Sequence, residues 1–310
     1  MLLGALELAA VAQPRLHPDR DPGDHSILEL GNTHTTWKQG VEHQSGAAAT
    51  ANIKAAASTR NLTYFGGPVI QNVIIMRVLY GSGPYQSFVN AGAVPNVDSF
   101  FTYLPQSIYY TWLSEYSTAS PLQKIGTGSY SGSITITPAA SRNGSTITDT
   151  QIQAEISAQI GAGKLPALSN NTVYMTFFPK GKKISQGGSN SCVAGGFCAY
   201  HGTFKRNGQN VFYGVMPHMS SGSGCDSGCG ASTPLNNQTS VASHELIEAV
   251  TDPAVGLANV YGPPLAWHNK TYGEIGDICN AQQSSIILNG LAYNMQKEWS
   301  NSKGACIIKY

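Results

Sequence analysis

The fold is indicated first by a β-branched run, Val69-Ile70-Gln71-Asn72-Val73-Ile74-Ile75-Met76-Arg77-Val78-Leu79-Tyr80, which Gly81-Ser82-Gly83-Pro84 closes. An apolar run bounded by turn residues predicts a buried strand that ends in a turn. The clearest helix is predicted over 149–161. Its signal consists of a capping acid, three isoleucines on one face and a closing glycine: Asp149, Ile152, Ile156, Ile160 and Gly161.

Strands and helices alternate through the rest of the chain. The elements predicted there are helices over 97–117 and 239–250, strands over 129–137, 172–179 and 210–216, and a hairpin over 286–295 that turns at Asn289-Gly290. This order predicts an α+β or α/β fold, in which helices pack on a mixed β-sheet. Because no repeat or linker divides residues 63–310, we expect a single globular domain there.

The N-terminal segment, residues 1–62, differs from the rest. Met1–Ala12 is apolar and ends in small residues, like a signal peptide, but it lacks a basic start and contains Glu7. We interpret it as a signal remnant. The remainder shows little periodicity and contains four of the eight histidines, at spacings that suit no metal motif: His17, His25, His34 and His43. We therefore expect a propeptide or an arm.

The charge content limits the partners of the chain. Charged residues make up 11% and the formal net charge is +1, whereas ordinary soluble domains contain about 25% charged residues. The longest basic cluster is the stretch 180–183, so the basic footprint that nucleic-acid binding needs is missing. No segment approaches the ~20 apolar residues of a membrane span. The sequence leaves the oligomeric state open.

All six cysteines lie in the second half of the chain. An even number predicts three disulfides, although sequence alone cannot fix their pairing. The short spacings favour Cys192–Cys198 and Cys225–Cys229, which leaves Cys279 for Cys306. The alternative is a zinc site at Cys225 and Cys229, which we disfavour because no second closely spaced pair accompanies it.

Several sequons agree with an oxidising, secretory route. The candidate glycosylation sites are Asn61, Asn143, Asn170, Asn237 and Asn269. Together with the cysteines, they predict a secreted, extracellular or cell-wall protein that carries disulfides in its C-terminal half.

The stretch with the most chemical potential is His244-Glu245-Leu246-Ile247-Glu248. On a helix, positions i and i+4 lie on one face, so His244 and Glu248 project together. This is the arrangement of the H-E-x-x-H metalloprotease helix, with Glu in place of the second His. The chain is therefore predicted to contain a zincin-like helix, on which Glu245 acts as the catalytic base towards water.

A catalytic zinc site needs a third protein ligand. Glu274 and Asp277, about 30 residues downstream in a glycine-flanked loop, are the obvious suppliers, and His201 and His218 are in reserve. Zn²⁺ is the expected cofactor. Ca²⁺ also suits carboxylate-rich sites, but the histidine argues against it. The plain alternative is an ordinary polar pair on a helix surface.

Two functions follow from this cluster. The first is a secreted zinc-dependent, peptidase-like hydrolase that acts on an extracellular peptide or a cell-wall polymer. The second is a non-catalytic extracellular protein of the cell wall or of growth signalling, with a structural or vestigial metal site. Replacing a neutral His by an anionic Glu makes zinc a weaker Lewis acid, which favours the second function somewhat.

The order of several motifs resembles the phosphate-induced protein 1 family, the EXORDIUM-like secreted proteins best known from plant cell walls. The most specific stretches are Ser243-His244-Glu245-Leu246-Ile247-Glu248 with Thr251-Asp252-Pro253, and Glu274-Ile275-Gly276-Asp277-Ile278-Cys279. The opening Gly66-Gly67-Pro68-Val69-Ile70 and the stretch Phe197-Cys198-Ala199-Tyr200-His201-Gly202 are also similar. The likeness runs from about Tyr64 to Cys306 and implies a role at the cell wall or in growth signalling.

The departures from that family indicate a divergent, non-plant member. Asp252 stands where plant members usually have Asn, and the loop Asn280-Ala281-Gln282-Gln283 is shorter than their glycine-rich loop. Residues 1–62 have no clear counterpart. The family has no settled biochemical activity, so the resemblance implies a location more than a reaction.

Overall fold

The structure is a computed structural model. It describes residues 59–90, 92–226, 228–230 and 232–310, and the backbone of 33–37. The expected signal remnant at Met1–Ala12 and the histidines His17, His25 and His43 lie outside the described residues.

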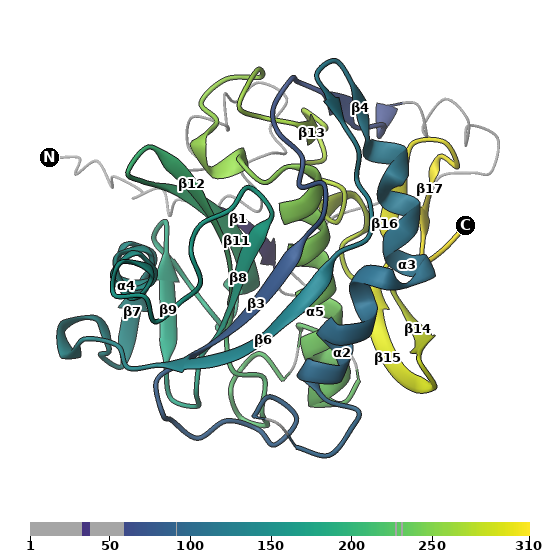
Figure 1. The fold of residues 1–310 in the computed structure, drawn as a ribbon. Helices are drawn as coiled ribbons and strands as arrows, with labels where there is room; N and C mark the ends of the chain where they lie inside the picture. Colours follow the sequence, from purple (N-terminus) through teal and green to yellow (C-terminus); the bar gives the residue numbers. More distant parts are fainter. Residues whose placement is uncertain (1–32, 38–58, 91, 227, 231) are drawn as a thin grey trace, which may run out of the picture.

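A six-stranded mixed sheet forms the centre of the molecule (Figure 1). Its strands, in spatial order, are β1 (Thr33–Trp37), β11 (Phe197–Arg206), β12 (Gln209–Met216), β8 (Thr172–Phe177), β3 (Ile74–Tyr80) and β6 (Ser129–Ile136). The pairs β12–β8, β8–β3 and β3–β6 are parallel, whereas β11 is antiparallel to both β12 and β1. The predicted mixed sheet is therefore present.

Alternation along the strands builds one hydrophobic core on each face of this sheet. Successive strand residues point to opposite faces, and in β3 Ile75 and Leu79 join one buried cluster while Met76 and Val78 join the other. The second cluster packs against α4 (Asp149–Gly161). The first packs against α2 (Val97–Tyr103) and α5 (Pro234–Thr251), which lie on the other side of the sheet (Figure 1).

Shorter elements surround this framework. Other helical elements in the described part of the chain are α3 (Ile108–Thr111) and the 3-10 turns η3 (Leu104–Gln106), η4 (Trp112–Tyr116), η5 (Ala140–Arg142), η6 (Val255–Leu257) and η7 (Asp277–Cys279). In a three-stranded sheet, β9 (Lys183–Gln186) lies between β7 (Thr146–Thr148) and β10 (Ser189–Asn190). The two-stranded sheets are β2 (Thr63–Tyr64) with β13 (Trp267–His268), β4 (Thr118–Ala119) with β5 (Leu122–Gln123), β14 (Gln283–Leu288) with β15 (Leu291–Gln296), and β16 (Glu298–Ser300) with β17 (Ala305–Ile307). The fold is mixed α+β.

Local sequence explains where two predicted helices begin and end. Helix α4 has the predicted bounds, but its N-cap is Thr148, which forms a capping box with Gln151. The single helix predicted over 97–117 is instead divided into α2, η3, α3 and η4. Pro105, in the first turn of η3, lacks the amide hydrogen that a continuous α-helix would need at this point.

The disulfides connect different segments of the chain, and two predicted pairs are wrong. The bonds are Cys192–Cys225, Cys198–Cys229 and Cys279–Cys306, and only the last was predicted. The prediction assumed local closure. Tertiary packing overrides it, because the loop before α5 lies against the start of β11 and brings Cys225 and Cys229 to cysteines more than thirty residues away. All six cysteines are used, which excludes the zinc site at Cys225 and Cys229.

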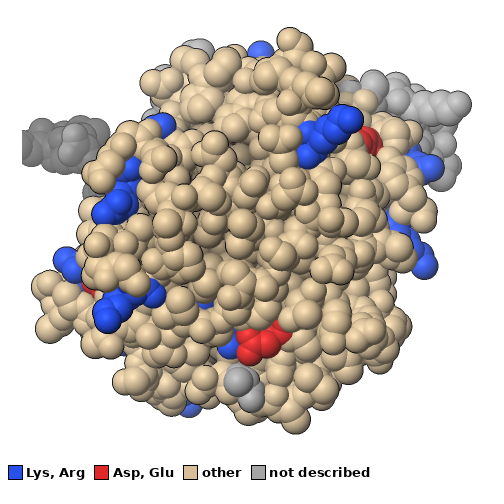
Figure 2. Space-filling view, in the orientation of Figure 1, with Lys and Arg blue, Asp and Glu red and all other residues tan. Residues whose placement is uncertain are grey.

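The surface is poor in charge, as the composition predicts. Figure 2 shows isolated blue and red side chains on a mostly uncharged face. Among the helices that the structure describes, none has the length and apolar character needed to cross a bilayer.

Candidate metal centre

Helix α5 carries the predicted motif through the centre of the molecule. Thr233 caps its N-terminus by accepting a hydrogen bond from the Asn236 amide, and the helix continues to Thr251. His244 Nε2 lies 3.0 Å from Glu248 Oε1, one helical turn away, and both side chains are 0% exposed. The alternative of an ordinary polar pair on a helix surface is therefore wrong.

A loop and a strand bring further ligands to this helix. Glu274 lies in the loop that leads into η7, and Asp277 is the first residue of η7; the Glu274 amide donates to Asp277 Oδ2 at 2.9 Å. The Asp277 amide in turn donates to Glu248 Oε1 at 3.1 Å, which fixes the loop to α5. Asp277 Oδ1 lies 3.9 Å from His244 Nε2.

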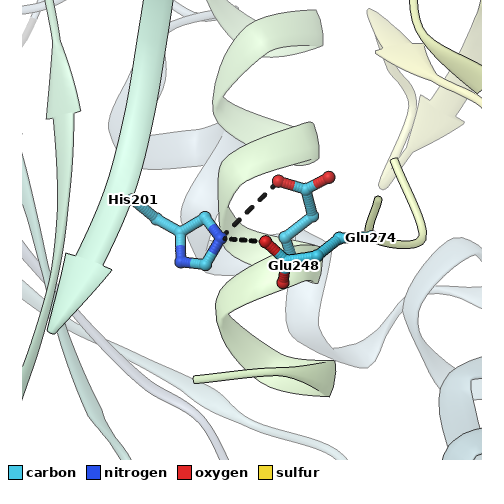
Figure 3. A group of neighbouring side chains, drawn as sticks. All are labelled: His201, Glu248 and Glu274. Atoms are coloured by element: carbon cyan, nitrogen blue, oxygen red, sulfur yellow. Dashed lines mark hydrogen bonds and ion pairs between the residues drawn. The ribbon is translucent and has the colours of Figure 1, made fainter. Parts of the chain in front are cut away.

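His201 comes from the middle of β11 and faces the same cluster (Figure 3). Its Nε2 lies 3.1 Å from Glu274 Oε2 and 3.6 Å from Glu248 Oε2. His201 and Glu274 are both fully buried. The two carboxylates thus converge on one imidazole from α5 and from the 274–277 loop.

The arrangement contains two groups that are able to hold a metal ion. One comprises His201, Glu248 and Glu274, and the other His244, Glu245 and Glu248. Within each group the potential ligand atoms lie within 4.8 Å of one another. Glu248 is the one residue common to both groups.

The imidazole of His244 has a second neighbour on β15. Gln296 Nε2 lies 2.6 Å from His244 Nδ1 and donates to the Gly276 carbonyl at 2.8 Å. A histidine that binds metal through Nε2 keeps its proton on Nδ1 and usually donates it to a nearby acceptor. As placed, the Gln296 Nε2 group can only donate, so Nδ1 accepts; half a turn of the amide would bring its oxygen to Nδ1 and give up the hydrogen bond to the Gly276 carbonyl. Gln296 is therefore suited to orient the ring.

Carboxylates strongly influence the titration of this region. Burial alone lowers the pKa of His244, but the neighbouring carboxylates of Glu248 and Glu245 outweigh it and hold the pKa well above its ordinary value. The first residue of β16, Glu298, is also fully buried, and burial raises its pKa well above the usual range. Its Oε1 accepts a hydrogen bond from the Tyr109 hydroxyl at 2.9 Å.

Most predicted ligands thus come together, although not in one set. Asp277 lies beside His244, whereas Glu274 lies beside His201, which was held in reserve. Glu245 belongs to the ligand group of His244 itself. His218 belongs to neither group and instead lines a pocket with Lys180, Lys182 and Lys183. Sequence reasoning missed Gln296, Glu298 and Tyr109, because no motif marks them.

The glycosylation candidates have different environments. Asn170 is exposed and remains a candidate. Asn237 is 1% exposed within α5, and Asn269 is 7% exposed and donates to the carbonyls of Thr59 and Asn61. A glycan on either would have to displace packed chain, so burial argues against both.

Gln296→Leu is expected to weaken metal binding by about ten- to a hundred-fold without unfolding the protein. The change removes the hydrogen-bonding partner of His244 Nδ1, and losing such a partner typically costs this much affinity. Competition with a chromophoric zinc chelator measures the change. Gln283→Leu, in the adjacent strand β14, is the matched control. Equal affinities for both variants and the wild type would contradict an orienting role for Gln296.

Comparison with family models, with curated proteins and with solved structures finds no match to this chain.

Proposed function

We propose that this protein is a secreted metalloprotein that binds a divalent transition-metal ion in its core, between α5, β11 and the 274–277 loop. One observation carries the proposal: two imidazoles and four carboxylates converge with at most 2% exposure. Isolated ionised carboxylates are very costly in a dry interior, and buried charges are generally paired or bind metals. A bound cation would relieve the repulsion among these four carboxylates.

The donor set favours zinc. Imidazole nitrogen combined with carboxylate oxygen suits Zn²⁺ and related transition metals, whereas Ca²⁺ prefers an all-oxygen shell. The three disulfides are compatible with an extracellular location.

Because the ligands are buried, a structural role for the ion is the first candidate function. When only the native state forms the site, the free energy of metal binding adds to the free energy of unfolding. The centre joins a strand, a helix and a loop that are distant in sequence. The ion would therefore stabilise the core of an extracellular protein.

Metal-assisted hydrolysis of peptides is the second candidate, and the carboxylate of Glu245 beside His244 favours it. Strand β1 pairs antiparallel with β11, and its residue His34 lies opposite His201 in the register. Strand β1 therefore occupies the edge of β11 next to the metal centre, and an extended peptide could pair with β11 there only in place of β1. A bound divalent cation supplies Lewis acidity that polarises a carbonyl and acidifies water. Glu245, next to His244, would accept the proton.

Glu245→Gln tests the hydrolytic candidate. If Glu245 is the base, this nearly isosteric change should lower peptide hydrolysis by roughly a hundred-fold per metal ion bound. The assay is cleavage of a fluorogenic peptide library, with metal content measured on the same samples. Hydrolysis by the wild type that persists at the same rate in the variant would rule Glu245 out as the base.

Zinc is expected to stabilise the chelator-treated protein, and more strongly as the pH rises. In the metal-free protein, the pKa of His244 is higher in the folded state than in the unfolded state, so the protonated imidazole stabilises the fold. This stabilisation is fully present below the unfolded pKa of 6.5 and is lost as the pH rises through the folded pKa. Zinc requires the neutral imidazole, so its contribution grows over the same range. At a hundred times the dissociation constant the gain is about 2.7 kcal/mol, or roughly 5–10 °C in thermal midpoint.

Thermal unfolding of the chelator-treated chain between pH 5.5 and 8.5, with and without Zn²⁺, measures this effect. Mg²⁺ serves as the control cation, because it prefers oxygen ligands. A zinc shift that is absent throughout, or that shrinks as the pH rises, would contradict the proposed function.

A further inference from the structure

We propose that the centre is dinuclear, with Glu248 as a bridging carboxylate between two divalent cations. One cation is held by His201, Glu274 and Glu248 Oε2. The other is held by His244, Glu245 and Glu248 Oε1, with Asp277 Oδ1 beside them at 3.9 Å from His244 Nε2. This inference rests on the proposed function, since it specifies how many ions that centre binds and which residues hold each one.

The two oxygens of Glu248 face different imidazoles. Oε1 lies 3.0 Å from His244 Nε2, and Oε2 lies 3.6 Å from His201 Nε2. Two donors that bind the same ion at about 2.0–2.2 Å stand roughly 3–3.5 Å apart. Each Glu248 oxygen is therefore already close to the separation it would need to share an ion with its own histidine.

Each imidazole has a second carboxylate of its own at a similar separation. Glu274 Oε2 lies 3.1 Å from His201 Nε2, and Asp277 Oδ1 lies 3.9 Å from His244 Nε2. The groups able to hold a metal ion contain one imidazole each and overlap at Glu248 alone. This pattern fits two ions linked by one carboxylate, and two-metal sites place their ions about 3.5–4 Å apart.

Backbone amides orient the carboxylates for this role. The Glu274 amide donates to Asp277 Oδ2, so that the other oxygen, Oδ1, is the one directed at His244. The Asp277 amide donates to Glu248 Oε1 and holds the bridging group between the loop and the helix. The ligands are thus fixed by the fold before any ion binds.

Charge balance also favours two ions. The four carboxylates, Glu245, Glu248, Glu274 and Asp277, carry four negative charges when ionised, and two neutral imidazoles add none. One divalent cation leaves two negative charges uncompensated, whereas two cations leave none. In a fully buried cluster, an uncompensated charge carries a desolvation cost that a second cation removes.

Metal stoichiometry of the full chain tests the proposal. The chelator-treated protein is titrated with Zn²⁺ by calorimetry and, separately, with Mn²⁺ for electron paramagnetic resonance. We expect two ions per chain, and an exchange-coupled Mn²⁺ spectrum in place of the signal of isolated ions. Glu274→Gln, which keeps the side-chain shape, should bind one ion and lose the coupling. His218→Ala, outside both groups, should keep two coupled ions.

The outcomes separate this inference from the proposed function. A wild-type chain that binds one ion, or two ions without magnetic coupling, overturns the bridged centre and leaves the metalloprotein proposal standing. A wild-type chain that binds no ion overturns both. Should Glu274→Gln fail to fold, the wild-type stoichiometry and spectrum still decide the question.

Discussion

His244→Ala is expected to abolish metal binding and to lower the free energy of unfolding by about 3–5 kcal/mol, as when one partner of a buried ion pair is removed. The substitution removes a ligand nitrogen. It also leaves the buried carboxylates of Glu248 and Glu245 without the imidazole that lies beside them. Gln296 also loses its contact with Nδ1. No rearrangement of an exposed side chain can compensate, because every one of these groups is buried.

Denaturant unfolding, together with metal content, measures both effects. His218→Ala is the matched control, because it removes a mostly buried histidine that belongs to neither ligand group. If His244→Ala keeps the wild-type metal content, His244 is not a ligand. If it unfolds at the same denaturant concentration as the wild type, the cluster contributes nothing to stability.

Gly276→Ala should have the second-largest effect, although it changes no ligand. A Cβ at this position would stand 2.8 Å from His244 Nδ1 and 2.9 Å from Glu248 Oε1, closer than real Cβ atoms approach their neighbours. Its backbone angles, φ −80° and ψ −36°, suit alanine, so the whole effect must come from this contact. Gly276 is thus the residue that allows the loop to approach α5.

Two ligands would be displaced at once in Gly276→Ala. If each displacement costs a factor of ten to a hundred in affinity, zinc binds roughly a thousand-fold more weakly. Overpacking adds about 1–3 kcal/mol of destabilisation. Gly262→Ala is the control, since a Cβ there meets only Val260 Cγ2 at 3.9 Å. Chelator competition on both variants decides the matter, and equal zinc affinities would mean that the loop is able to move away without loss of the site.

The elements that could be predicted from sequence are those that local patterns determine. The β-branched run before Tyr80 is part of the central strand β3, and the isoleucine stripe of α4 packs on the sheet as its spacing indicates. The contact between His244 and Glu248 follows from helix geometry alone. The glycine-flanked loop correctly indicated that Glu274 and Asp277 belong near α5.

What could not be predicted depends on strand order and on tertiary packing. His201 reaches the centre because β11 lies beside β12 in the sheet, next to α5, and no local pattern encodes that position. Gln296 and Glu298 reach it because the hairpin of β14 and β15 folds back onto α5. The disulfides mislead for the same reason, since Cys225 and Cys229 pair across a tertiary contact.

The most direct test of the central claim is the metal content of the full chain, purified without chelator and analysed by inductively coupled plasma mass spectrometry. The metalloprotein proposal predicts at least one stoichiometric divalent transition metal per chain, with zinc foremost, and its loss in His244→Ala. A folded wild-type chain that carries only trace metal, and that takes up none when Zn²⁺ is restored, would contradict it.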